Sequence, residues 1–282
     1  MKDKICLITG ATSGIGQAAA LALLEMGAEV VLVGRDPEKT KRVVSELQRC
    51  SGRSSVSFLL ADLSDQQQIG SLARQFRESY PRLDVLVNNA GAVFAQRELT
   101  VDGLEKTFAV NHMAYFLLTT ALLDCIPVGG RIVNTSSDAH RTAHMRWHDL
   151  QICQGYNPFF AYAQSKLANV LFTRELAHRL QSRQISVNAF HPGVVRTGIW
   201  NSRNWISEWI RLGQRWMLSA AEGAKTLVYL ASSPDVASAT GGYFVRNHMQ
   251  IPASQAMDAA AALRLWEVSQ DLFSNRSGVS PV

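Results

Sequence analysis

Tyr162 and Lys166 are the two residues of this 282-residue chain whose types and spacing most clearly permit chemistry. In a helix, side chains four residues apart lie on one face, so the phenol and the ammonium group are neighbours. A nearby positive charge favours phenolate, and Lys166 is therefore expected to lower the pKa of Tyr162. Such a phenol can exchange a proton with a substrate oxygen. The alternative is an ordinary pair of surface residues, because this spacing also arises by chance.

A glycine-rich turn near the N-terminus has the pattern of a nucleotide site. The apolar run Lys4–Thr9 precedes the turn, and the helix-favouring run Gln17–Leu24 follows it. This order places backbone N–H groups and the positive end of a helix against a pyrophosphate. The glycine spacing is G-x-x-x-G-x-G, not G-x-G-x-x-G. We expect cofactor contacts from the turn, with a plain tight turn as the alternative; the residues are Gly10, Thr12, Ser13, Gly14, Ile15 and Gly16.

Composition favours one large α/β domain. The net charge of +5 is mildly basic and its Lys and Arg residues are dispersed, which makes nucleic-acid binding a minor interpretation. The four cysteines lack a C-x-x-C pair or metal-ligand spacing, which favours free thiols in a reducing compartment. We expect no signal peptide and no transmembrane segment, and hence a cytoplasmic protein.

Short apolar runs alternate with longer stretches of helical periodicity, which predicts parallel strands connected by helices. We expect a single-domain α/β Rossmann-type fold, a doubly wound parallel sheet of about seven strands with helices on both faces. Residues 4–135 would form mainly the cofactor half, residues 136–250 the catalytic and substrate half, and residues 251–282 a C-terminal extension with a helix over 259–273. The expected strands are 4–9, 29–33, 56–60, 83–87, 131–135, 185–190 and 242–245.

Polar and small residues follow the third and fourth expected strands, where ligands of such sheets bind. Asp62 could accept a hydrogen bond from an adenine amine, or it could cap the helix expected over 65–79. Small residues at a strand end let a cofactor pass closely. We therefore expect cofactor contacts at both strand ends, from Asp62, Leu63, Asn89, Ala90 and Gly91.

Together these motifs resemble the short-chain dehydrogenase/reductase family, from about Lys4 to at least Tyr243. Segments at 110–112, 116–119 and 191–197 are similar to its retinol-dehydrogenase-like branch. The resemblance implies a catalytic tetrad in which Tyr162 is the general acid/base, Ser137 binds the substrate oxygen, Lys166 also binds the nicotinamide ribose, and Asn111 holds a relay water. Ser136 is the alternative to Ser137. It also implies nicotinamide contacts from Pro192, Gly193, Val195 and Thr197.

The residues after the second strand bear on the choice of cofactor. Arg35 can pair with the 2′-phosphate of NADP(H), and the position where an acidic residue would accept the ribose hydroxyl of NAD(H) is Gly34. We therefore expect NADP(H). If the register slips by two residues, Asp36 becomes the ribose acceptor and NAD(H) is preferred; otherwise Asp36 caps the next helix.

Residues 138–157 form an insert that we expect to be a loop. It carries His140, His144 and His148 at four-residue steps, which would align three imidazoles if the segment were helical. No acidic or cysteine ligands accompany them, so we expect no metal site and assign the histidines to the substrate entrance or to the exposed surface.

The segment 204–217 has an amphipathic helical pattern with a stripe of Trp205, Trp209, Leu212 and Trp216. It follows the expected nicotinamide loop, so it could form a lid over an apolar substrate. Packing against the core and peripheral membrane contact are the alternatives.

These expectations combine into an NADP(H)-dependent oxidoreductase that interconverts a lipophilic, retinoid-like or steroid-like alcohol with its carbonyl compound. A reductase of small xenobiotic carbonyls and a non-catalytic dinucleotide sensor are the alternatives. The resemblance also suggests a homodimer, with the apolar run Leu167–Phe172 as one contact surface.

Overall fold

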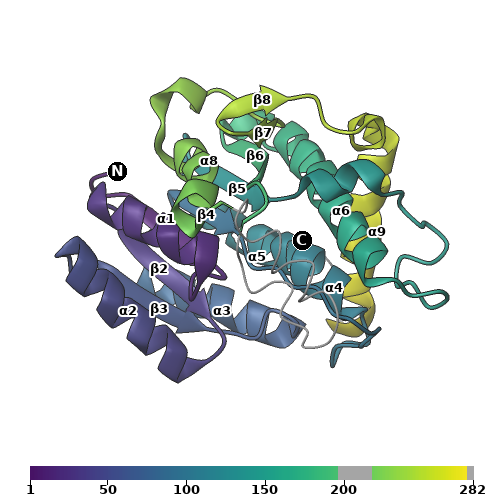
Figure 1. Ribbon diagram of the computed structural model, residues 1–282, viewed down its shortest axis with the longest axis horizontal. Helices are drawn as coiled ribbons and strands as arrows, with labels where there is room; N and C mark the ends of the chain where they lie inside the picture. Colours follow the sequence, from purple (N-terminus) through teal and green to yellow (C-terminus); the bar gives the residue numbers. More distant parts are fainter. Residues whose placement is uncertain (196–217, 278–282) are drawn as a thin grey trace.

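A computed structural model describes residues 1–195 and 218–277 of the chain. The expected nicotinamide contact of Thr197 and the amphipathic segment 204–217 lie outside the described residues. A mixed sheet runs through the centre of the structure, with helices packed on both of its faces (Figure 1). This confirms the expected fold class.

The sheet has eight strands in the order β3-β2-β1-β4-β5-β6-β7-β8. The first seven are parallel, and each lies within two residues of a strand expected from the sequence. Successive strands are added toward one edge of the sheet from β1 to β3 and toward the other edge from β4 onward. The reversal between β1 and β4 creates the crevice at which such sheets bind ligands. The strands are β1 Ile5–Thr9, β2 Glu29–Gly34, β3 Val56–Leu60, β4 Val85–Asn88, β5 Arg131–Thr135, β6 Ser186–His191, β7 Tyr243–Val245 and β8 His248–Gln250.

The expected sheet of about seven strands lacked β8, which pairs antiparallel with β7. Arg246 and Asn247 make the connecting turn with φ values of 49° and 66°. Glycine is the usual residue at such angles, and this turn contains none. The strand itself is three residues long and exposed, so it has no alternation of apolar and polar residues.

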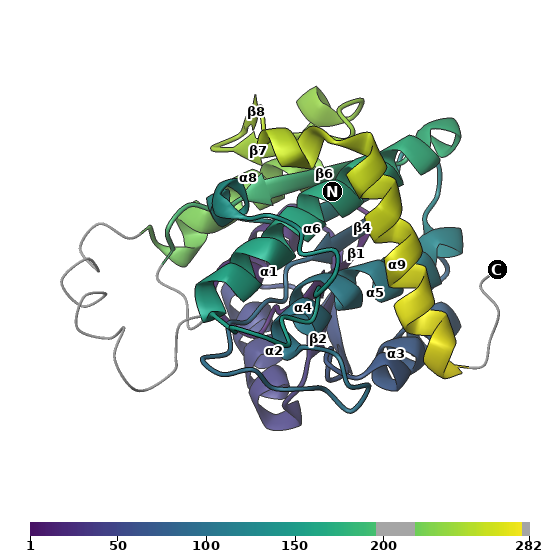
Figure 2. The ribbon, with the colours of Figure 1, turned by 90° about the vertical axis from the view of Figure 1, so that its right-hand side faces the viewer.

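Two layers of helices enclose the sheet. One layer comprises α1 Gly14–Glu25, α2 Pro37–Ser51 and α8 Ala220–Ser232. The other comprises α3 Gln66–Ser79, α5 Ala114–Leu122 and α6 Pro158–Arg179, with α9 Ala259–Ser277 crossing over α6 (Figure 2). The shorter elements are α4 Lys106–Phe108, η1 Ala109–Met113, η2 Leu123–Cys125, η3 Asp138–Thr142, η4 Gln181–Arg183, η7 Pro234–Val236 and η8 Ser254–Met257.

Successive side chains of β1 enter two different hydrophobic cores. Cys6 and Ile8 pack with α1 and α8, whereas Ile5 and Leu7 pack with α3 and α5. Because side chains of a strand alternate between the two faces of a sheet, a central strand covered on both faces is a continuous apolar run. That is why the run at the N-terminus could be recognised as a strand.

Capping residues begin the helices near the cavity described below. The Asp36 carboxylate accepts from the Lys39 amide at the start of α2, as expected for its capping role. Asp65 caps α3 by accepting from the amides of Gln67 and Gln68. The alternative that Asp62 caps this helix is therefore wrong.

The C-terminal helix α9 covers α5 and α6 of the same chain. The Trp266 ring lies 5.0 Å from the Phe116 ring and 6.1 Å from the Phe172 ring, measured between centroids. Leu167–Phe172 is buried inside the chain. The prediction that this run is a contact surface of a homodimer is therefore wrong. The helix extends to Ser277, four residues beyond the end expected from the sequence.

Among the described residues, one helical segment is long and apolar enough to span a membrane. It runs through Lys106–Cys125 with a mean hydropathy of 1.2, and 67% of that window is buried inside the protein. Here it packs against α3 and α6, as a core helix does.

Asp84 connects the beginnings of β1 and β4. Its side chain is 4% exposed and accepts from the Ile5 amide, Lys4 Nζ and Arg82 Nε, each at 2.9 Å. Burial acts to raise the pKa of Asp84, but these hydrogen bonds outweigh it and hold the pKa below its usual 3.8.

Replacing Asp84 by Ala should therefore lower the free energy of unfolding by about 1–3 kcal/mol, because the Ile5 amide loses its partner. The lowered pKa means that the wild-type carboxylate stabilises the fold fully above pH 4 and less as the pH falls further. Urea unfolding at pH 7 and pH 3 measures this. A difference between wild type and D84A that is as large at pH 3 as at pH 7 would contradict the assignment.

Candidate active site

A cavity of about 860 Å³ lies at the carboxyl ends of β1, β2, β3 and β4. Eleven of the twelve cofactor residues expected from the glycine turn and the strand ends line it; Gly16 is the exception. Those eleven are Gly10, Thr12, Ser13, Gly14, Ile15, Arg35, Asp62, Leu63, Asn89, Ala90 and Gly91.

The glycine turn folds tightly against the end of β4. Gly10 has a φ of 64°, and a Cβ there would lie 2.7 Å from the Cα of Ala90. Asn89 Nδ2 donates to the carbonyls of Thr9 and Gly10, which joins the two strand ends. A Cβ on Gly16 would lie 2.5 Å from the Gly10 carbonyl oxygen. Gly16 therefore lets α1 pack onto the turn; it does not line the described cavity, so its cofactor contact remains a prediction.

The N-terminus of α1 faces the cavity through Ser13, Gly14 and Ile15. Within the described residues, the Ser13 side chain makes no capping hydrogen bond, and the first turn of the helix carries no acidic residue. The first amides of a helix lack helical partners and attract anions. A dinucleotide pyrophosphate fits this cradle, because Gly10 and Gly14 add no side chains to it.

Two cations and one carboxylate stand where β2 and β3 end. Arg35 and Lys39 both line the cavity, and the Arg35 guanidinium is 73% exposed and lies 3.7 Å from Asp62 Oδ2. Burial acts to raise the pKa of Asp62, but hydrogen bonds from Ser64 and the charge of Arg35 keep it below its usual 3.8. Lys39 was not among the predicted cofactor residues, although its position in the first turn of the helix that Asp36 caps indicated that it could face the cofactor.

Gly34 cannot be replaced by a residue with a side chain without local rearrangement. A Cβ there would lie 2.1 Å from Thr40 Oγ1 and 2.9 Å from Thr12 Cγ2. An acidic ribose acceptor therefore has no room at this position. The carboxylate of Asp36 is already engaged in capping α2, which weakens the alternative of a shifted register.

Tyr162 and Ser137 form a hydrogen-bonded pair between α6 and the turn after β5. Burial raises the pKa of the Tyr162 phenol, and the hydrogen bond with the Ser137 side chain offsets this in part. Ser137 Oγ also accepts from the Ala139 amide, which leaves the hydroxyl proton of Ser137 available for donation to another group. Ser136 is different, because its hydroxyl is buried and donates to the Lys166 carbonyl. The geometry thus favours Ser137 over Ser136.

Lys166 is buried one helical turn from Tyr162, with Nζ 5.5 Å from the centre of the Tyr162 ring. Nζ donates to the Thr135 carbonyl at 3.2 Å. Burial lowers the pKa of Lys166 to about 7. The expectation that Lys166 lowers the pKa of Tyr162 is wrong for the protein without a bound cofactor. Burial penalises the phenolate of Tyr162 and the ammonium of Lys166 alike, so the Tyr162 pKa is raised. The phenol is held protonated, as a proton donor requires.

Asn111 lies within η1, a π-helical turn that joins α4 to α5. Its amide accepts from the Ala92 nitrogen and donates to the Ala92 carbonyl and to Ser165 Oγ. A Cβ on Gly91 would lie 3.4 Å from Asn111 Oδ1 and 3.5 Å from Lys166 Nζ. Asn111 and Lys166 therefore approach the same point of the cavity wall. Single π-helical turns often occur at functional sites.

Asn169 joins the groups around Lys166 and was not foreseen. It is fully buried, and Nδ2 donates to the carbonyls of Asn111 and Thr135 at 2.9 and 3.1 Å. The Thr135 carbonyl is also the acceptor for Lys166. The spacing of Lys166 and Asn169 on one face of α6 could have indicated this role.

The remaining expected residues lie after β6. Pro192 and Gly193 follow it directly, Gly193 with a φ of 85°, and Val195 pairs with Leu218 in an isolated parallel bridge. Pro192, Gly193 and Val195 do not line the described cavity, so their nicotinamide contacts remain predictions, as does that of Thr197 outside the described residues.

The insert 138–157 is mostly a loop, as expected, beginning with the short helix η3. His144 and His148 are exposed, but His140 is fully buried, which corrects its assignment to the entrance or the surface. Within the described residues, no cluster of three or more His, Cys, Asp or Glu side chains could hold a metal ion. All four cysteines are free thiols.

Comparisons with known proteins agree with this geometry. The model of the family described as short chain dehydrogenase matches residues 4–206. DnrU of Streptomyces sp. (strain C5), provisionally named a daunorubicin C-13 ketoreductase, is 41% identical over 270 residues, which cover 95% of this chain and 92% of that protein. Human retinol dehydrogenase 14 is 37% identical over 298 residues, covering 96% of this chain and 86% of that protein.

A solved structure provides the third comparison. It is provisionally titled a short chain dehydrogenase from Shigella flexneri 2a str. 301, complexed with NADP. Its TM-score with this chain is 0.68 at 28% identity, and the match covers 88% of this chain and 98% of that one.

Proposed function

The chain belongs to the short-chain dehydrogenase family, and on that premise we propose that it is an NADP(H)-dependent oxidoreductase interconverting a lipophilic alcohol with its aldehyde or ketone. The observation that carries the proposal is the buried, protonated Tyr162 phenol, hydrogen-bonded to Ser137. A second support is the glycine cradle at the N-terminus of α1, which fits a dinucleotide.

The nicotinamide cofactor, when bound, supplies or accepts the hydride. Ser137 Oγ, which accepts from the Ala139 amide, donates a hydrogen bond to the substrate carbonyl oxygen and orients it. Tyr162 donates its phenolic proton to the same oxygen as negative charge develops there. In the reverse direction Tyr162 removes the hydroxyl proton. Reduction is the direction we propose for the cell.

Lys166 returns a proton to Tyr162 after each reduction. Its pKa of about 7 lets it gain and lose a proton near neutral pH. The Thr135 carbonyl and Asn169 hold Nζ and its surroundings in place. Asn111 positions the chain at Ala92 beside the cavity, and we keep for it the proposed role in a water relay.

Arg35 and Lys39 support NADP(H) over NAD(H), because both cations line the cavity near the end of β2. Replacing Arg35 by Ala should raise the dissociation constant of NADPH by about tenfold or more, since a charge-assisted hydrogen bond contributes roughly 1.5–3 kcal/mol. NADH binding should change by less than about twofold. Titration of cofactor fluorescence measures both.

Lys39→Ala should act in the same sense as Arg35→Ala. Lys41→Ala is the matched control, because Lys41 lies on the same helix, pairs with Glu38 and does not line the cavity. Equal losses of NADPH and NADH affinity in the Arg35 variant would reject the 2′-phosphate assignment.

The substrate proposed is retinoid-like or steroid-like. The names of the two relatives, a retinol dehydrogenase and a daunorubicin ketoreductase, support a bulky apolar alcohol or carbonyl compound. The test is NADPH oxidation with aldehydes and ketones graded by chain length and ring number. Activity that rises with apolar size supports the proposal, whereas a preference for the smallest carbonyls favours the xenobiotic alternative. NADPH binding without turnover of any compound favours the sensor.

Location and assembly are also proposals. We propose a cytoplasmic protein whose segment 204–217 forms a lid over the substrate, with core packing and peripheral membrane contact as the alternatives. A homodimer would need a surface other than Leu167–Phe172, because α9 covers that run. Vesicle sedimentation and light scattering test the two proposals.

A further inference from the structure

His140 joins the catalytic turn to the C-terminal extension of the chain. Its side chain is fully buried between η3 and the segment that precedes η8. Nδ1 lies 2.7 Å from the Ser137 carbonyl oxygen, and Nε2 lies 3.0 Å from the Ala253 nitrogen. The imidazole therefore bridges two segments that are more than 100 residues apart in the sequence.

The two partners determine which ring nitrogen carries the proton. The Ala253 amide is only a donor, so Nε2 must accept. Nδ1 then carries the proton and donates to the Ser137 carbonyl. Neutral His140 satisfies both bonds at once, and burial lowers its pKa, which favours this neutral form.

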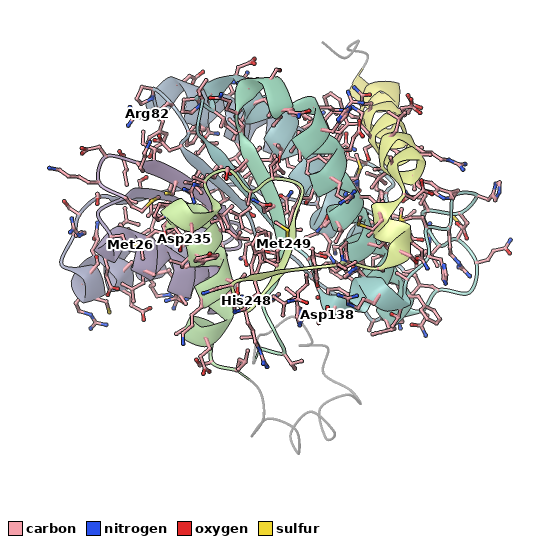
Figure 3. All side chains as sticks on the ribbon, turned by 90° about the horizontal axis from the view of Figure 1, so that it is seen from above. Met26, Arg82, Asp138, Asp235, His248 and Met249 are labelled. Carbon is pink, nitrogen blue, oxygen red and sulfur yellow. The ribbon has the colours of Figure 1, made fainter. Side chains whose placement is uncertain are left out.

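A second contact joins the same two segments. Arg141 Nη2 donates to the Ile251 carbonyl at 2.9 Å, and Arg141 Nε donates to Asp138, the exposed carboxylate labelled in Figure 3. The His140 ring also packs against the edge of Tyr243, with 4.7 Å between centroids. The turn that carries Ser137 is thus fixed from β7 and from the C-terminal extension.

We infer that His140 is a positioning residue through which the C-terminal segment 251–257 holds catalytic Ser137 in place. The Ser137 carbonyl accepts from both the backbone amide and the imidazole of His140. These bonds set the backbone angle from which the Ser137 hydroxyl reaches Tyr162 and the substrate oxygen. Small misplacements of such a group reduce the rate more than they reduce binding.

Ala253 offers a substitution that breaks the bond to His140 from the side of the C-terminal segment. Its φ of −59° is the angle that proline adopts, and Ala253→Pro replaces the amide hydrogen by a ring carbon that cannot donate and that pushes against His140 Nε2. Ala253→Ser keeps the amide and is the matched control. His140→Asn removes the same bond from the other side, because the shorter amide still reaches the Ser137 carbonyl but not Ala253.

Hydrogen exchange of the full-length protein tests the coupling without any substrate. Ala253→Pro should speed amide exchange in residues 137–143, where no residue has been changed, and His140→Asn should do the same. Ala253→Ser should exchange as wild type does. Unchanged exchange over 137–143 in both Ala253→Pro and His140→Asn would overturn the inference.

Steady-state kinetics tests the catalytic consequence, which rests on the proposed function. Ala253→Pro and His140→Asn should each lower kcat about three- to tenfold, the effect of losing one hydrogen bond. The KM of the carbonyl compound and the NADPH dissociation constant should stay within about twofold. The double variant should be no slower than His140→Asn, because both changes break the same bond between His140 and Ala253.

Additive losses in the double variant, or wild-type kcat in Ala253→Pro, would contradict the role of His140. A wild-type enzyme that turns over no carbonyl compound would reject the proposed function, while the exchange experiment would still decide the coupling.

Discussion

Replacing Tyr162 by Phe should lower kcat for carbonyl reduction by about a thousandfold, within the range observed for loss of a general acid. The phenol is the group that donates a proton to the substrate oxygen, and burial keeps it protonated. Phenylalanine preserves the ring and its packing in α6. The NADPH dissociation constant should therefore change by less than about threefold. Single-turnover oxidation of bound NADPH measures the chemical step, and fluorescence titration measures binding.

Tyr80→Phe is the matched control for this variant. The Tyr80 hydroxyl also bonds a serine, Ser57, at 2.6 Å, but Ser57 lies on β3 at the edge of the sheet, whereas Ser137 follows β5. It should lose stability and no activity. If Tyr162→Phe retained more than a tenth of wild-type kcat, the proton donor would have to be another group.

Replacing Lys166 by Met should lower kcat by about a hundredfold, because Tyr162 would lose its proton supply. The side chain is 2% exposed, and a buried ammonium is costly, whereas methionine has a similar shape and no charge. The variant should therefore fold as stably as wild type at pH 7, or more stably. Opposite changes in activity and stability would distinguish a functional lysine from a structural one.

The pH dependence of stability gives a second test of Lys166. Its pKa in the folded protein is about 7, against an ordinary value of 10.5. Between these values the unfolded chain binds more protons, so wild-type stability rises with pH across this interval. Lys166→Met should lack that part of the rise, whereas Lys225→Met, at an exposed site on α8, should keep it. Parallel curves for wild type and Lys166→Met would contradict the lowered pKa.

The sequence contained enough information to locate the sheet and the cofactor cradle. The central strand β1 is apolar throughout because both its faces are covered, and Gly10 marks a turn that no other residue could make without contact at Ala90. These are local signals. β8 was missed because Arg246 and Asn247 form its turn without glycine.

The site was less predictable where the burial and hydrogen bonds of a side chain depend on parts of the chain that are distant in the sequence. Tyr162 and Lys166 have the spacing of an ion pair, but their electrostatics depend on burial by elements far away in the sequence. His140 was assigned to the substrate entrance or the surface because nothing near it in the sequence indicates that Ala253 will donate to its ring. Lys39 and Asn169 were missed because lysines and asparagines on helices are common, and only the fold shows what they face.

The most direct measurement of the central proposal follows the hydride itself. NADPH in which both hydrogens at C4 of the nicotinamide are deuterium is incubated with the protein and a lipophilic ketone, and the product alcohol is analysed by mass spectrometry and NMR. The proposed function predicts one deuterium on the carbinol carbon, on a single face, formed by wild type and about a thousandfold more slowly by Tyr162→Phe. An alcohol without deuterium, or no alcohol from any lipophilic carbonyl compound although NADPH binds, would contradict it.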